Sequence, residues 1–301
     1  MKTLKNTFII LTLLISTHLF SQEKIVITEQ QVDMIKGNQP AFVVIIPKAT
    51  AKLIQESWTK KIRQNTKAKI QQEGAVFSIT GTRIIEIYND PINVYSSVIQ
   101  LDASVKLISL FEVDNEFLGA GTKDSDEYFR KAYENIKKFI YYFAVKEYKS
   151  SVSKELDIEN KRLQNLAKQL FDLEKQKTTL HKNIGTNEQY IKKSETIISK
   201  SEKTMENVLS EIDKYQASLS SASEEDKKDL NKLLTKKEKE KTTTKSKLEK
   251  EHKKVFDYQA KINELTKSLE NNVKSQKETK ERIDRQIVTI HNVTDKLNNI
   301  R

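Results

Sequence analysis

Side chains that could carry acid–base, nucleophilic or metal chemistry are few and scattered in this chain. It has four histidines and no cysteine. His18 lies in the N-terminal apolar segment, and His181, His252 and His291 are too widely spaced for a metal-ligand pattern. The sequence therefore predicts no imidazole-based catalysis, no thiolate nucleophile, no metal and no cofactor. We expect a protein that is not an enzyme.

Two weaker signals for chemistry have simpler explanations. Glu112, Asp114 and Glu116 alternate at the end of an expected strand and could bind Ca²⁺. Acids on an exposed strand edge also aid solubility, which is the interpretation we favour, although an enzyme that uses only carboxylates remains an alternative. The Gly119-Ala-Gly121 segment lacks the Lys-Ser/Thr of a phosphate-binding loop.

Positive charge is the main candidate binding feature. The net charge is +11, and residues 232–254, here called the basic segment, hold ten lysines and four glutamates. Such a segment could bind an anionic envelope surface, lipid phosphates or an acidic channel mouth. The alternative is a solvated helix face with local Glu–Lys pairs. The candidate binding lysines are Lys232, Lys236, Lys237, Lys239, Lys241, Lys245 and Lys247.

Nucleic acid is not an expected partner, because no aromatic residues for base stacking are interleaved with these lysines. Aromatic residues instead crowd positions 139–143. One helix face cannot bury all of them, so Tyr141 and the nearby Tyr148 either pack against a returning C-terminal segment or mark a partner surface.

The N-terminus resembles an export signal. Lys2 and Lys5 precede an apolar run at 8–15, and Ser21 ends a short polar stretch. This pattern predicts a cleaved signal peptide over 1–21, with a retained N-terminal anchor as the alternative. The mature protein is expected to be soluble and periplasmic or secreted.

Chain-breaking residues divide the chain into two parts. All three prolines precede residue 92, and five of the six glycines precede residue 122. We expect an α+β domain over 22–149, the head, with a buried strand at 41–46, a helix at 50–64 that buries Trp58, and a second helix through 129–143. Strand-like pieces lie around 68–72, 75–79, 83–88, 92–101 and 105–113. The order predicts an antiparallel sheet with helices on one face, with ferredoxin-like connectivity as one option.

Residues 150–301, the stalk, carry a heptad repeat that predicts an antiparallel coiled-coil hairpin with its bend near 220–224. The first frame starts at Leu156 and the second runs through Leu234. Facing residues then have numbers that add up to 449, as for Ile184 and Leu265. Lys177 falls opposite Asn272 in a polar layer, and one uninterrupted helix in a parallel dimer is the alternative.

These features together predict a non-enzymatic exported scaffold or adaptor of the bacterial envelope. The head would dock a protein partner, and the stalk would space or bind a second one. Self-association through the stalk is a further option. The alternative function is a periplasmic hairpin adaptor associated with a transport or secretion channel.

Overall fold

The computed structural model describes residues 24–64, 66–121 and 126–301, so the predicted signal peptide over 1–21 lies outside the described residues. The chain divides into two units. The first comprises the chain up to Asn160 together with Val288–Arg301, and the second is Lys161–Ile287. The units are taken in turn below.

The first unit contains an antiparallel sheet. Its spatial order is β1 (Ile27–Met34), β2 (Gly37–Pro47), β6 (Ser104–Val113), β5 (Ile92–Gln100), β4 (Val76–Thr82) and β3 (Gln71–Glu73), and the two-residue β7 (Glu116–Phe117) pairs with β6. The predicted antiparallel sheet is confirmed. Ferredoxin-like connectivity, in the order strand, helix, strand, strand, helix, strand, needs a second helix before its last strand. In the described chain β3, β4, β5 and β6 are consecutive neighbours in the sheet and α2 follows all the strands, so the connectivity differs from that option.

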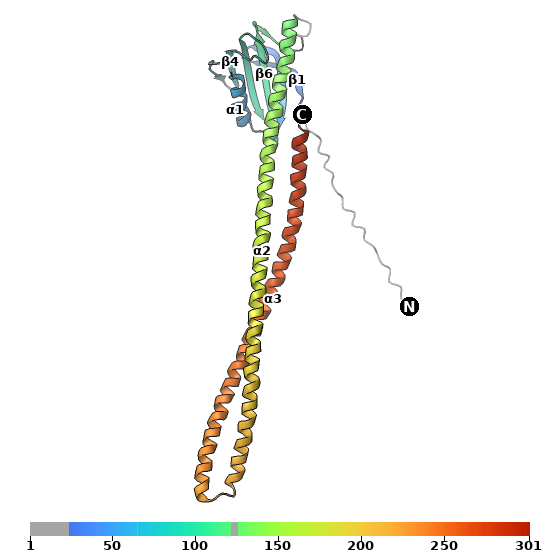
Figure 1. Ribbon diagram of the computed structural model, residues 1–301. Coiled ribbons are helices and arrows are strands. Elements are labelled where there is room, and N and C mark those ends of the chain that lie inside the picture. The colour runs from blue at the N-terminus through green and yellow to red at the C-terminus, as the bar shows by residue number, and fades with distance from the viewer. Residues whose placement is uncertain (1–23, 65, 122–125) are drawn as a thin grey trace, which may run out of the picture. The chain divides into compact units, whose positions relative to one another are not determined.

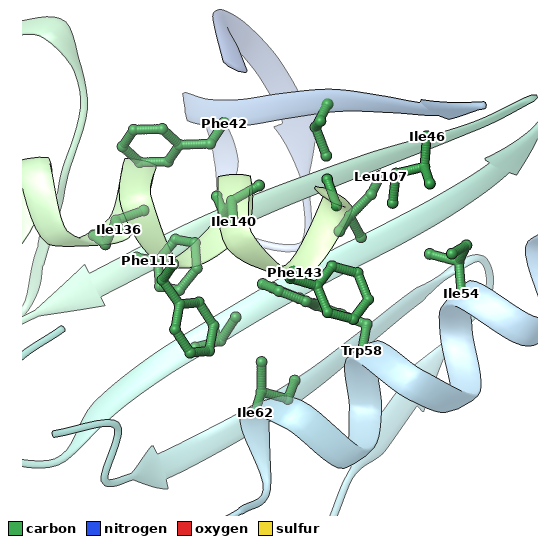
Figure 2. Packing of buried hydrophobic residues seen from close by; sticks show 14 of the residues in the cluster. Phe42, Ile46, Ile54, Trp58, Ile62, Leu107, Phe111, Ile136, Ile140 and Phe143 are labelled. Atoms are coloured by element: carbon green, nitrogen blue, oxygen red, sulfur yellow. The ribbon is translucent and has the colours of Figure 1, made fainter. Parts of the chain in front are cut away.

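Two helices pack on one face of this sheet. In α1 (Ala51–Ile62), the Thr50 side chain caps the first turn, and Ile54, Trp58 and Ile62 recur at helical spacing and are fully buried. The start of α2 (Glu127–Leu219) contributes Phe139 and Phe143. Figure 2 shows Trp58 of α1 meeting Phe143 of α2. The Trp58 ring centroid lies 4.8 Å from that of Phe143 and 5.6 Å from that of Phe139. The predicted core position of Trp58 is confirmed.

The strand expected at 83–88 is wrong. The pairing of β4 with β5 is irregular between Ile79 and Thr82, and the chain then turns, with the N–H groups of Ile87 and Tyr88 both donating to the Ile84 carbonyl. Ile84 and Ile87 are both buried in the same core. Residues three apart point to opposite faces of a strand but to the same side of a tight turn, and this explains the apolar spacing.

The two long helices form a hairpin, as predicted. The 93-residue α2 ends at Leu219, and the 76-residue α3 (Glu224–Asn299) begins five residues later. Ser223 caps α3, because its hydroxyl oxygen accepts from the Asp226 N–H at 3.3 Å while Glu224 and Glu225 lie in the first turn. The bend therefore falls at 220–223 (Figure 1).

Contacts within the second unit fix the register of the arms. Tyr190 lies against Tyr258 with ring centroids 5.2 Å apart, Glu211 forms an ion pair with Lys237, and the Asn272 side-chain amide donates to Gln176 at 2.9 Å. In each pair the residue numbers add up to 448, one less than predicted. All the predicted seam positions in this unit are buried or half-buried. The antiparallel pairing is confirmed.

The polar layer of the seam lies close to its predicted place. Asn272 and Gln276 are both buried, and their side-chain amides donate to the Leu173 carbonyl at 3.1 and 3.3 Å. Asn272 thus donates to this carbonyl and to Gln176, the residue directly before the expected Lys177, and accepts from the Gln276 amide at 2.7 Å. A polar group that must find its partner inside an apolar seam favours one register over its neighbours.

The end of α3 belongs to the core of the first unit. Val293 and Ile300 are buried in the same cluster as Tyr148 and Val152 of α2. Ile25, just before β1, also joins this cluster. Segments from the beginning and the end of the described chain therefore share one core with the middle of the sequence.

Candidate interaction surfaces

The structure separates the candidate lysines into two groups, and the first faces the seam. Lys237 pairs with Glu211 of the opposite arm and with Glu240 at 2.9 Å, and these two hydrogen bonds raise its pKa. Lys241 pairs with Glu238 at 3.3 Å. Lys237 thus links the two arms, while Lys241 is paired within α3, and both are poor candidates for binding a partner.

The second group points away from the seam. Lys236, Lys239, Lys245 and Lys247 are exposed, and no carboxylate of the described residues forms an ion pair with them. Lys232 is intermediate, because it is exposed and also pairs with Asp229 at 3.0 Å. A lysine without a carboxylate partner keeps its full charge for an external anion, so the outer group forms the stronger candidate surface.

The two candidate tyrosines occupy different environments. Tyr148 is buried, and the Lys296 ammonium near the end of α3 lies 5.5 Å from its ring centroid. It therefore packs against the returning arm. Tyr141 is half-buried at the edge of the core, with its ring centroid 5.7 Å from that of Tyr142, which is 66% exposed. Of the two candidate tyrosines, only Tyr141, together with the neighbouring Tyr142, is accessible to a partner.

The strand-end carboxylates serve the sheet. Glu112 is buried and accepts hydrogen bonds from the Tyr95 hydroxyl at 2.9 Å and from the Asn93 side-chain amide at 3.0 Å. Asp114 accepts from the Tyr88 hydroxyl at 2.8 Å. Within the described part of the chain, no group of three acidic or histidine side chains could hold a metal ion.

The Tyr95–Glu112 contact leads to a prediction about alkaline stability. Burial, with the Glu112 hydrogen bond second, raises the pKa of Tyr95 to about 12 from its usual 10.0, so the folded state favours the neutral phenol. This stabilisation is complete below pH 10 and is lost as the pH rises from 10 to 12. Denaturant unfolding across that range should show this loss, and Tyr95→Phe should reduce it. An unchanged pH dependence in Tyr95→Phe would contradict the assignment.

The sheet face opposite the helices was not singled out from the sequence. Its centre is a small apolar cluster that contains Ala41, Val43, Tyr95, Ile108 and Leu110. At one end of this face the chain exposes aliphatic side chains on both sides of a lysine, because Ile45 of β2 and Ile99 of β5 are both paired with Lys106 of β6. Ile45 is 50% and Ile99 43% exposed.

We call Ile45, Lys106 and Ile99 the open-face row. The signal for it was present in the sequence, since the run at 41–46 is apolar at consecutive positions and a strand shows alternate residues to opposite faces. Exposed apolar groups that lie together on one face can mark a protein-binding surface.

Comparisons of the chain with protein-family models, with curated proteins and with solved structures found no match. In the part of the chain that the structure describes, no helix has the length and apolar content needed to cross a bilayer. Function must therefore be argued from the fold and its surfaces.

Proposed function

We propose that the protein is a non-enzymatic scaffold or adaptor of the bacterial envelope, exported through its N-terminal signal. The head docks one protein partner, and the hairpin spaces or binds a second. The observation that carries the proposal is the hairpin itself, a pair of long helices with a defined bend and a fixed antiparallel register.

The hairpin suits a spacing role. In the second unit each arm has about 60 residues, which corresponds to roughly 90 Å of helix at 1.5 Å per residue. Two features keep the arms in one register. These are the buried amides of Asn272 and Gln276 and the ion pair between Glu211 and Lys237. Because the two arms cannot slide past each other, the length of helix between the bend and the other end of the arms stays constant.

The head offers the open-face row as the docking surface for its partner. Ile45 and Ile99 expose apolar area, and a partner that covers this area removes it from water and so stabilises the complex. Lys106, which lies between them, selects a partner with an acidic group at that place. The same row contains no pair of groups arranged for catalysis. Binding is therefore the activity that this surface supports best.

The test uses site-specific photo-crosslinking in cells. A photoreactive amino acid is placed at Ile99 on the head and, in a separate variant, at Ser221 in the bend, which is also exposed. The proposal expects two different envelope components to be captured, one from each position. Capture of a transport or secretion channel from Ser221 would favour the alternative function.

A shortened hairpin distinguishes spacing from simple binding. Deleting 177–190 and 258–271 together removes two heptads from each arm, keeps the facing register and the polar contacts of Asn272 and Gln276, and shortens the arms by about 20 Å. Each partner should still be captured separately, while the joint complex of both partners is lost. The spacing role would be contradicted if the head and bend positions captured no protein, or if the joint complex stayed intact in the shortened variant.

A further inference from the structure

Five of the ten lysines of the basic segment lie in one stripe along the outside of α3. In the α3 heptad, with Leu234 and Lys237 at the two seam positions, the outermost sites recur every three or four residues. These sites carry lysine or a hydroxyl residue throughout. The lysine stripe consists of Lys232, Lys236, Lys239, Lys250 and Lys253, with Thr243 and Ser246 between them. All seven residues are exposed.

Carboxylates are kept away from the middle of the stripe. Glu238, Glu240 and Glu251 pair with Lys241, Lys237 and Lys254 at the seam or beside it. Glu249 lies at the edge, while Asp229 and Asp257 occupy the outer sites just before and just after the stripe. The outer sites between Asp229 and Asp257 thus carry no carboxylate, and Lys232 at one end pairs with Asp229. The extent of the stripe, from 232 to 256, corresponds to about 35 Å of helix.

The opposite arm offsets only part of the charge of the basic segment. Residues 195–217 of α2 hold five acidic residues and three lysines. One of these acids, Glu211, forms an ion pair with Lys237 at the seam. The positive potential is therefore concentrated on the outer side of α3, where it faces solvent.

An exposed aromatic residue stands at the end of the stripe. Phe256 follows Lys253 by three residues on the same side of α3 and is 74% exposed, the highest value among the exposed large hydrophobic residues of the described chain. A seam position would bury this ring, yet the chain places it outside. Lysines with an exposed phenylalanine on one helix are the composition of a surface that meets the interface of a lipid bilayer.

We propose that the lysine stripe and Phe256 form a peripheral binding site for a phospholipid surface that carries anionic headgroups. Lysine ammonium groups on flexible stems bind phosphates as point charges and need no fixed geometry. The five lysines follow one another along a single helix and do not converge on a point, so their ligand must present many phosphates along a line. An anionic bilayer presents such phosphates and accepts the phenylalanine ring between its headgroups. This inference rests on the proposed function in one respect, since it names the chemistry of the second attachment site.

The test is co-sedimentation of the purified full chain with vesicles. Wild type should sediment with vesicles of phosphatidylglycerol and phosphatidylcholine, should stay in solution with phosphatidylcholine alone, and should be released by added salt. Changing Lys236, Lys239, Lys250 and Lys253 to Gln should weaken partitioning about a hundredfold, because each lysine near an anionic surface contributes several-fold. Phe256→Ala should weaken it several-fold while leaving the salt dependence unchanged.

A matched variant controls for net charge. Lys161, Lys168, Lys175 and Lys182 are exposed lysines spaced seven apart on α2, and changing them to Gln removes the same charge from the other arm. This control should keep most of the binding. Equal loss in the two variants, or sedimentation with the neutral vesicles, would overturn the proposal.

A second experiment distinguishes the source of the phosphates. Soluble polyphosphate should compete only weakly if the lipid surface is the ligand, because it offers nothing to Phe256. Full competition at equal phosphate concentration, together with no effect of Phe256→Ala, would show that the stripe binds a free polyanion and overturn the lipid assignment. Failure in vesicles would leave the protein partners tested by crosslinking untouched, so the two proposals fail separately.

Discussion

Replacing Trp58 by alanine should destabilise the first unit by about 3–5 kcal/mol, the usual cost of deleting a buried aromatic side chain. Trp58 is fully buried, packs edge-on against Phe139 and Phe143, and donates its indole N–H to the Ser96 hydroxyl at 2.8 Å. The substitution therefore leaves a cavity between α1 and α2. Because the long helices dominate the circular dichroism signal, amide exchange in β5 and β6 is the appropriate measurement.

Trp58→Phe separates packing from hydrogen bonding. It keeps an aromatic ring in the core and removes the indole N–H, while Ser96 retains its hydrogen bond with Ser109 at 3.1 Å. The expected cost is about 1–2 kcal/mol. If Trp58→Ala left amide exchange in β5 and β6 unchanged, the proposed joint core of the helices and the sheet would be contradicted.

The second large effect is expected at the end of α3. Val293→Ala combined with Ile300→Ala should destabilise the first unit by about 2–5 kcal/mol, because both side chains are buried beside Tyr148 and Val152. The loss of these contacts should also increase amide exchange in the last turns of α3. Thermal unfolding followed by calorimetry and amide exchange by mass spectrometry measure the two effects.

A pair of neighbouring residues on the same helix provides the control. Ile287 and Val288 are 50% and 59% exposed, so Ile287→Ala with Val288→Ala removes similar atoms without opening a cavity. Its effect should stay within about 0.5 kcal/mol. Similar destabilisation by the two double variants would mean that the end of α3 does not contribute to this core.

The hairpin could be predicted from the sequence because its signals repeat. A heptad pattern over many turns leaves few alternatives, and the serine cluster at 220–223 is the one place where small polar residues interrupt it. The cap at Ser223 and the register within one residue follow from the same pattern. Local rules and long-range pairing agree there.

The head was harder to predict, for identifiable reasons. Strand β1 was missed because its middle, Glu29–Gln31, is polar, as expected of an edge strand that is exposed on much of its surface. The segment around Ile84 and Ile87 was assigned to a strand because apolar content alone does not distinguish a strand from a turn that buries two isoleucines. In both cases the structure depends on which other strand the segment pairs with, or on its having none, and the residues of the segment alone do not specify this.

The candidate surfaces were predictable in part. The basic segment was found from composition, but its division into seam lysines such as Lys237 and outer lysines such as Lys239 required the heptad positions to be combined with the ion pairs. The apolar run at 41–46 indicated a second apolar face, but the open-face row itself required the register of the sheet, because Ile45, Lys106 and Ile99 come from three strands.

The antiparallel hairpin is the central claim, and a cysteine pair tests it most directly. The chain contains no cysteine, so Tyr190→Cys with Tyr258→Cys introduces the only two thiols, at positions whose rings lie 5.2 Å apart. Mild oxidation at low protein concentration should produce an intramolecular disulfide, seen as a monomer of altered mobility and as one linked peptide pair by mass spectrometry. Tyr190→Cys alone should then remain monomeric. A disulfide-linked dimer through Cys at position 190, with no intramolecular link in the double variant, would show a parallel dimer and contradict the account.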